Sequence, residues 1–104
     1  MRFDEIGASL AQGITLIQEA LRATEDVATQ TEVLSVNAAI EAARAQGESG
    51  RTFGVVAKEI QRVAHTTKRT TRHVGDILAN FSGQAEAIRR LAEEMVAALK
   101  ANGV

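Results

Sequence analysis

Residues 30–57 read QTEVLSVNAAIEAARAQGESGRTFGVVA, and this stretch decides how the chain folds. It places Gly47 and Gly50 between two long segments rich in Ala, Val, Leu and Ile. Glycine adopts the positive φ angles that other residues resist, so a short glycine-containing segment between two periodic apolar segments indicates a chain reversal. We therefore predict a hairpin tip here, with a turn at residues 46–51 and the fold-back point near Ser49.

Apolar residues on both sides of this turn recur at alternating steps of four and three, which is the spacing of a coiled-coil seam. In the first arm, about residues 3–45, the predicted seam is Leu10, Ile14, Ile17, Leu21, Thr24, Ala28, Thr31, Ser35, Ala38, Ala42 and Ala45. In the second arm, about residues 52–101, it is Val56, Ile60, Val63, Thr67, Thr70, Val74, Ile77, Phe81, Gln84, Ile88, Leu91, Met95 and Ala98. Folding back at the tip would pair Leu10 with Ile88 and Leu21 with Ile77. The prediction is one all-α domain over residues 1–104, a long antiparallel helical hairpin.

One flank of each predicted seam is also largely apolar, which leaves more apolar surface than two helices alone can cover. On the first arm this flank is Ile6, Gly13, Ala20, Val27 and Leu34. On the second arm it is Ala57, Ala64, Thr71, Leu78, Ala85, Ala92 and Leu99. A helix that is apolar over about a third of its circumference suits a four-helix bundle. We therefore expect two hairpins to associate as a homodimer.

Three further glycines, Gly13, Gly75 and Gly83, fall inside the predicted helices. Each costs about 1 kcal/mol of helix stability relative to Ala. Close packing of the two helices explains them better than a flexible point in the rod, and we expect packing at all three.

The composition excludes most catalytic and cofactor chemistry. The chain has no Cys, which removes disulfides, thiolate nucleophiles and thiolate metal sites. His65 and His73 are separated by about 12 Å along a helix, too far to share one metal ion. No serine has a base at motif spacing, so we predict no enzyme, no metal and no cofactor.

Overall charge is balanced, with 12 basic and 13 acidic residues and a net charge of -1. Such a chain has no global attraction to nucleic acid or to an anionic membrane. The first twenty residues include Asp4, Glu5 and Gln12 and match neither a secretory signal nor a membrane span. We expect a soluble, cytoplasmic chain without a membrane segment.

One segment of the second arm is nevertheless basic, through Lys58, Arg62, Lys68, Arg69 and Arg72. Basic helices can follow nucleic-acid phosphates, but the predicted register places Arg72 opposite Asp26 and His73 opposite Glu25. No aromatic residues alternate with the basic ones to stack on bases. The sequence therefore favours a solvated face, partly paired across the hairpin, over nucleic-acid binding.

The outward face of the first arm changes character toward the tip. It is polar as far as Thr29 and then carries Val33, Val36 and Ile40, and Val55 points outward just after the turn. Apolar residues confined to one end of a solvated rod indicate a protein-docking surface.

Polar residues accompany this apolar cluster. Glu41 and Arg44 stand three apart, so they are either an ordinary ion pair within the helix or recognition groups at the rim of the cluster. Asn37 is a modest helix former in mid-helix, and its amide can both donate and accept hydrogen bonds. A binding partner explains Asn37 better than local helix stability does.

The tip segment resembles the cytoplasmic signalling domain of methyl-accepting chemotaxis receptors. The residues that carry the resemblance are Gln30-Thr31, Leu34, NAAIEAARA at 37–45, Gly50-Arg51, Phe53 and Val55-Val56-Ala57. The resemblance implies an antiparallel hairpin that dimerises into a four-helix bundle and joins trimers of dimers. It also implies a tip that binds a coupling adaptor and a histidine kinase, with signals carried by shifts in bundle packing.

By matching position, the resemblance divides the tip residues into two groups. Adaptor and kinase docking falls to Val33, Val36, Asn37 and Val55. Tip packing and contacts between dimers fall to Ile40, Glu41, Arg44 and Phe53. Glu93-Glu94 followed by Ala97-Ala98 partly resembles a methylation site of the family, but Arg89-Arg90 stand where small residues precede such sites.

Three residues depart from the family pattern at the tip. Thr29 stands where a phenylalanine is usual, Glu32 stands where an asparagine is common, and Gln46 makes the turn one residue longer. These departures leave a second hypothesis open, a receptor-like structural or competitor coiled coil that binds partner proteins without controlling a kinase.

Overall fold

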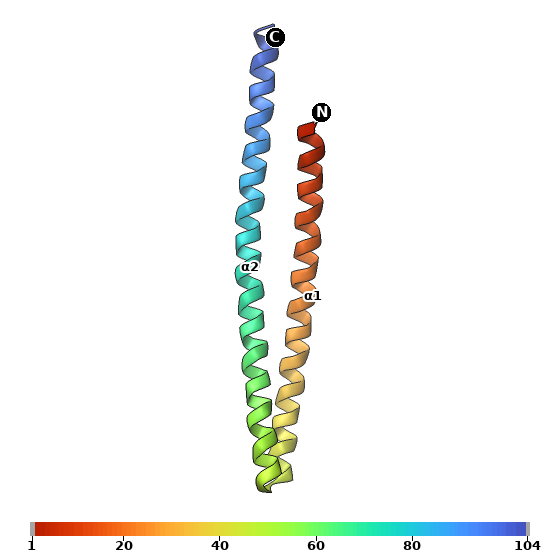
Figure 1. The fold of residues 1–104 in the computed structure, drawn as a ribbon, viewed down its shortest axis with the longest axis vertical. Coiled ribbons are helices and arrows are strands. Elements are labelled where there is room, and N and C mark those ends of the chain that lie inside the picture. Colours follow the sequence, from red (N-terminus) through yellow and green to blue (C-terminus); the bar gives the residue numbers. More distant parts are fainter. Residues whose placement is uncertain (1, 104) are drawn as a thin grey trace. The chain divides into compact units, whose positions relative to one another are not determined.

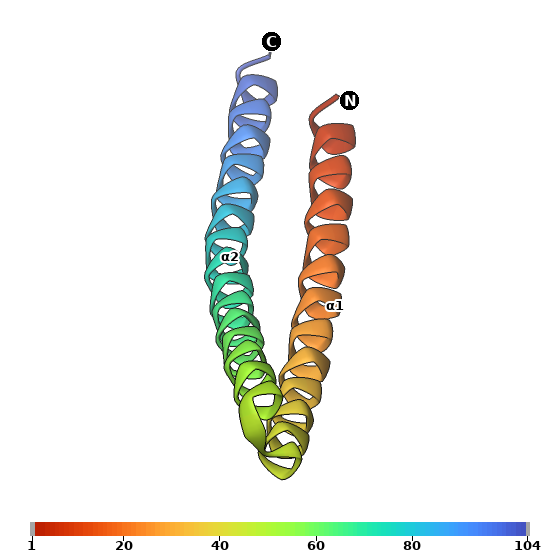
Figure 2. The ribbon, with the colours of Figure 1, turned by 60° about the horizontal axis from the view of Figure 1, so that its bottom comes forward.

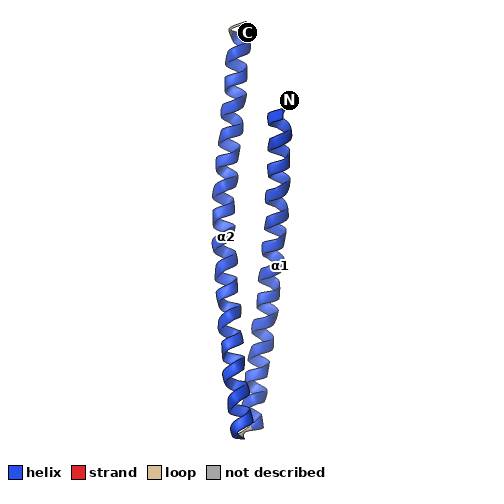
Figure 3. Ribbon diagram, viewed as in Figure 1, coloured by secondary structure: helices blue, strands red, loops and turns tan. Residues whose placement is uncertain are grey.

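The computed structural model describes residues 2–103, which form two helices (Figure 1). Helix α1 is Arg2–Ala45 and helix α2 is Gly47–Ala101, and the two helices run antiparallel. Within the described residues all regular secondary structure is helical (Figure 3). The prediction of an all-α chain of two long antiparallel helices is confirmed.

The chain reverses at Gln46, the one residue between the helices (Figure 2). Gln46 has a φ of 56° and Gly47 a φ of 75°, so two successive residues adopt the left-handed conformation. Glycine adopts this conformation at little cost, whereas for a residue with a side chain, such as Gln46, it costs about 1–2 kcal/mol of conformational free energy. Residues 47–51, which we expected in the turn, form the start of α2.

Segments of both helices form two compact units. The tip unit is Ala20–Val74 and contains the turn, while the terminal unit is Met1–Glu19 with Gly75–Val104. In each unit a segment of α1 is antiparallel to a segment of α2.

Small side chains line the contact between the helices in the tip unit. The buried residues there are spaced by sevens: Ala28, Ser35 and Ala42 on α1, and Gly50, Ala57, Ala64 and Thr71 on α2. The Ser35 hydroxyl donates to the carbonyl oxygen of Glu32 at 2.7 Å, and the Thr71 hydroxyl donates to that of Lys68 at 2.8 Å. Both buried hydroxyls are thereby satisfied, so small polar residues can share the seam with alanine.

The seam that we predicted from the sequence is half right in α1. The series Ile14, Leu21, Ala28, Ser35 and Ala42 is half-buried or buried, as expected. The alternate series is exposed, apart from the half-buried Thr31: Leu10, Ile17, Thr24, Ala38 and Ala45.

In α2 the predicted seam is wrong. Every one of its members except the half-buried Thr67 is exposed. The expected pair of Leu10 and Ile88 does not form, because Ile88 is 65% exposed. Around Leu10 and Ile14, α2 instead presents Ser82, Ala85 and Arg89. In α2 the predicted series follows most of the large apolar side chains, but two backbones approach most closely where side chains are small.

The large apolar residues form a separate surface, which we call the apolar face. In the tip unit it comprises Val27, Leu34, Val56, Ile60, Val63 and Val74, all exposed. Thr24 of α1 lines a groove together with Val63, Thr67 and Thr70 of α2, so these positions beside the seam lie on the same side of both helices. The terminal unit has its own exposed set: Ile6, Leu10, Ile17, Ile77, Phe81, Ile88, Leu91, Met95 and Leu99.

The glycines inside the helices are not explained by packing within the chain. A Cβ atom added to Gly13, Gly75 or Gly83 would meet nothing within 4 Å. The expectation of close helix packing at these three glycines is therefore wrong for contacts within one chain.

Candidate functional site

An exposed apolar stripe lies on α1 in the tip unit. Val33, Val36 and Ile40 are separated by steps of three and four, so they share one side of the helix, and all three are exposed. The buried Ser35 and Ala42 face the contact with α2, away from Val33 and Ile40, and Val36 lies between these two sides of the helix. We call Val33, Val36 and Ile40 the outer stripe.

Val55 lies on the same side of the tip unit as the outer stripe. It lines a groove of about 520 Å³ between the helices, together with Ala39 and Ala43 of α1 and Lys58 of α2. Ala43 follows Val36 by seven residues, so Val36 occupies the same side of α1 as this groove wall. The structure thus brings Val55 into the region of the outer stripe, as the sequence predicted.

Phe53 lies apart from that region. It is exposed, and it is two residues from Val55, so the two side chains leave α2 on different sides. Phe53 is not among the residues that line the tip groove. The tip therefore presents apolar side chains on more than one side.

The polar residues of the predicted site are exposed on α1. Asn37 is exposed beside the outer stripe. Glu41 and Arg44 form an exposed ion pair with a nitrogen–oxygen distance of 4.0 Å, as the spacing predicts. Such a pair contributes only a few tenths of a kcal/mol and leaves both groups accessible to a partner.

Two ion pairs connect the helices across the tip unit. Lys68 Nζ lies 3.5 Å from Glu32 Oε1, and their side chains are only 19% and 30% exposed. Arg72 Nη2 lies 3.9 Å from Glu25 Oε1, so the predicted pairing of Arg72 with Asp26 is wrong by one residue. Glu32 and Lys68 both lie near the seam, and the register predicted from the sequence, which is one heptad position away in α2, does not bring them together.

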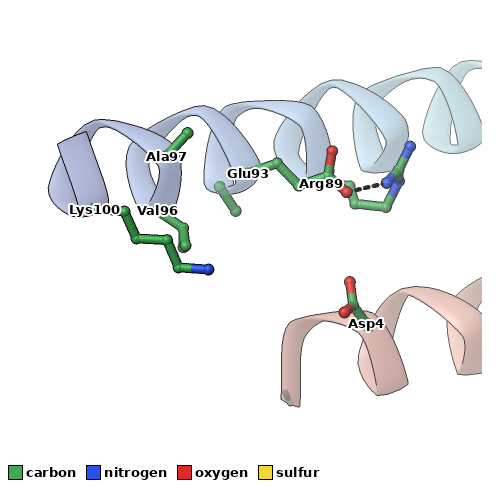
Figure 4. A pocket seen from close by; sticks show the side chains of 7 residues that line it. Asp4, Arg89, Glu93, Val96, Ala97 and Lys100 are labelled. Atoms are coloured by element: carbon green, nitrogen blue, oxygen red, sulfur yellow. Dashed lines mark hydrogen bonds and ion pairs between the residues drawn. The ribbon is translucent and has the colours of Figure 1, made fainter.

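A second hollow lies in the terminal unit (Figure 4). It is lined by Asp4, Arg89, Ala92, Glu93, Val96, Ala97 and Lys100. Arg89 donates hydrogen bonds to Glu86 and to Glu93, and the bond from Arg89 holds the pKa of the Glu86 carboxyl below its usual range. The guanidinium is thus already matched by two carboxylates, and the hollow contains no nucleophile next to a base.

Residues 2–103 show neither a metal-ligand cluster nor a helix that could span a membrane. No group of three or more His, Cys, Asp or Glu side chains there could hold a metal ion. Neither described helix has a stretch long and apolar enough to cross a bilayer.

The described part of the chain defines a structural class, the antiparallel helical hairpin with an exposed apolar tip. Residues 3–102 match the family model of the methyl-accepting chemotaxis protein (MCP) signalling domain, and the chain belongs to this family. The resemblance seen in the tip sequence is confirmed.

Curated relatives agree with this assignment. The chain is 44% identical over 71 residues to the biofilm dispersion protein BdlA of Pseudomonas aeruginosa, covering 68% of this chain and 16% of that protein. It is 38% identical over 89 residues to the methyl-accepting chemotaxis protein CtpM of the same organism, covering 82% of this chain and 16% of CtpM. It is 45% identical over 60 residues to McpC of Bacillus subtilis, covering 58% of this chain and 9% of McpC. The matched regions are thus small parts of much longer proteins.

Proposed function

We propose that the chain is a cytoplasmic signal-transduction module that docks a coupling adaptor and a histidine kinase through its tip. The observation that carries this proposal is the outer stripe, in which Val33, Val36 and Ile40 of α1 are all exposed. Solvent-exposed aliphatic residues at i, i+3 and i+7 form a ready surface for a partner. Val55 and Asn37 extend this surface, while Glu41, Arg44 and Phe53, with Ile40, serve tip packing and contacts between dimers.

The proposed module works as a homodimer in which two apolar faces meet to form a four-helix bundle. Support comes from the many large aliphatic residues that one chain leaves exposed beside its narrow seam. A bundle of this kind can change its packing between discrete arrangements and so bias a bound kinase.

The docking role is tested with Val36→Glu and Ile40→Glu in a pull-down of a purified coupling adaptor and histidine kinase. Each places a charge in the proposed interface, where an unpaired buried carboxylate is strongly unfavourable, so we expect binding to be lost. Thr15→Glu is the matched control, because Thr15 precedes Val36 by three heptads and therefore sits at the same heptad position in the terminal unit. Retained binding by both tip variants, with helicity unchanged, would exclude the docking role.

A second function is supported by the ion pair between Glu32 and Lys68 and by the polar Thr29. Glu32 is engaged by Lys68 at 3.5 Å, and Thr29 puts a polar group on the outward side of α1 next to the outer stripe. These features fit a receptor-like structural or competitor coiled coil that binds the same partners without controlling the kinase. Autophosphorylation of the kinase in assembled complexes separates the two: a change on adding the chain supports control, and an unchanged rate with binding supports the scaffold.

A further inference from the structure

The basic segment of α2 is only partly neutralised by the chain itself. Residues 51–72 contain Arg51, Lys58, Arg62, Lys68, Arg69 and Arg72 but a single acidic residue, Glu59. Arg62 pairs with Glu59, Lys68 with Glu32 and Arg72 with Glu25. Among the described residues, Arg51, Lys58 and Arg69 have no ion-pair partner. Pairing across the hairpin, which the sequence favoured, thus accounts for two of these six basic residues.

The basic side chains gather along one side of α2. Lys58, Arg62, His65 and Arg69 are spaced by four, three and four residues and line one groove of about 460 Å³ together with Glu32 of α1. Lys58 also lines the tip groove that contains Val55 and Ala43. Lys58 therefore lines both grooves and lies between them.

The α1 wall of the tip groove is apolar. Ala39, Ala42 and Ala43 line it, and Val36 occupies the same side of α1 as Ala43, seven residues earlier. In the basic groove, the one that contains Arg69, the α1 wall is Glu32. Val36 of the outer stripe therefore borders the tip groove on the α1 side, while Lys58 borders it on the α2 side and Arg69 lies in the adjoining basic groove. We call this combination, Val36, Ile40 and Ala43 with Val55, Lys58 and Arg69, the mixed surface.

We propose that the mixed surface binds an acidic segment of a partner protein, with the partner's apolar side chains against α1 and its carboxylates toward Lys58 and Arg69. The inference rests on the proposed docking function and adds the chemistry of the segment that docks. Charge complementarity carries it: cations without an intramolecular partner beside an aliphatic wall match a segment that is both acidic and apolar.

Other anionic partners fit the mixed surface less well. Nucleic acid would leave the aliphatic wall unused, and His65 is the one aromatic ring among the lining residues, whereas a single-strand binding site stacks successive bases on several rings. A flat anionic bilayer would contact the outermost cations but not the recessed groove, where Gln61 is half-buried. A protein segment can enter the groove and use both walls.

The test measures binding of the purified full chain to a coupling adaptor and histidine kinase from Pseudomonas aeruginosa. We expect Lys58→Glu with Arg69→Glu to raise the Kd about tenfold or more at low salt, and to reduce the dependence of binding on NaCl, because two attractive cations become repulsive. The matched control is Arg22→Glu with Arg90→Glu, which makes the same change in net charge at arginines that line neither groove and have no ion pair among the described residues. The control should change the Kd by less than about twofold, with the helicity of both variants checked by circular dichroism.

The outcomes separate this inference from the proposed function. If Val36→Glu abolishes binding while the Lys58/Arg69 variant binds like its control, the docking function stands and the acidic-segment proposal is wrong. If neither variant weakens binding, both the docking function and the acidic-segment proposal are wrong. Binding of the chain to vesicles of phosphatidylglycerol and phosphatidylcholine is the last measurement. Vesicle binding that the Lys58/Arg69 variant loses, with adaptor and kinase binding unchanged, would overturn the proposal in favour of a membrane.

Discussion

A Cβ atom on Gly50 would lie 2.7 Å from the backbone carbonyl oxygen of Ala42. The atom it would meet belongs to the backbone, so no side-chain rotation can relieve the contact. We expect Gly50→Ala to push the helices apart at the tip and to lower the free energy of unfolding by about 1–3 kcal/mol, less the gain in helix propensity from alanine. Urea denaturation followed by circular dichroism measures this change.

Gly75→Ala is the matched control for that prediction. Gly75 is also helical, but a Cβ atom there meets nothing within 4 Å. The substitution should raise the free energy of unfolding by up to about 1 kcal/mol through helix propensity alone. Equal effects of the two substitutions would contradict the close approach at Gly50.

The sequence was sufficient to predict the helical hairpin, the region of the turn and the exposed outer stripe, because these depend on local signals. Glycine spacing marks a reversal, and Val33, Val36 and Ile40 interrupt a polar face whichever way the helices pack. The contact between the helices could not be predicted in the same way. Large and small apolar residues repeat with the same heptad spacing, and periodicity alone does not say which series faces the partner helix. One heptad position of error placed Ile88 in the seam and concealed the pairing of Glu32 with Lys68.

The Glu32–Lys68 pair should stabilise the register of the tip unit. Its side chains are more protected from water than those of the other ion pairs, so Coulombic attraction is screened less there. We expect Glu32→Lys alone to destabilise the hairpin by roughly 1 kcal/mol or more, because it places two ammonium groups together. The exchanged double variant Glu32→Lys with Lys68→Glu should recover most of the loss in a double-mutant cycle. Additive effects of the two substitutions would show that the pair contributes nothing.

Stability should fall in mild acid because of two arginine-bound carboxylates. Hydrogen bonds from Arg62 lower the pKa of Glu59, and those from Arg89 lower the pKa of Glu86. A carboxyl whose pKa is lower in the folded chain stabilises folding above its unfolded value of about 4.3, and this contribution is lost as pH falls through the folded pKa. Both groups are exposed, so the effect should be small and should weaken with salt. The urea midpoint measured between about pH 6 and pH 3 reports it.

A pair of glutamine variants provides the comparison for the acid response. Glu59→Gln with Glu86→Gln should flatten the fall in stability below about pH 4.3, because the two linked groups are removed. Glu19→Gln with Glu94→Gln removes two glutamates that form no ion pair among the described residues and should leave more of the fall in place. The same curve for both variants would assign the acid response to other groups.

Two apolar surfaces of the tip unit should differ in what they bind, although their exposure in one chain is similar. Ile60 and Val63 of the apolar face are 40% and 49% exposed, and Val33 and Val36 of the outer stripe are 56% and 38% exposed. The exposed fraction of the side chains therefore does not decide which of the two surfaces contacts a second copy of this chain. The heptad repeat can decide it, because the heptad positions of the apolar face recur in the terminal unit as Ile6, Ile77, Phe81, Ile88, Leu91 and Met95, whereas the outer stripe consists of three residues near the tip. A four-helix bundle needs apolar residues at heptad positions that recur along its helices.

We therefore expect Ile60→Glu with Val63→Glu to convert a dimer into a monomer in sedimentation equilibrium. Four carboxylates would otherwise be buried without partners at the centre of the proposed bundle, which costs far more than the buried aliphatic surface contributes. Val33→Glu with Val36→Glu introduces the same charges and should remain dimeric, because in the proposed bundle these side chains stay in water. If the second variant dissociates and the first does not, the outer stripe is the dimer contact, and the docking function assigned to it loses its basis. If the unmodified chain is already a monomer, the four-helix bundle is excluded for this chain, and the apolar face must be covered by a different protein.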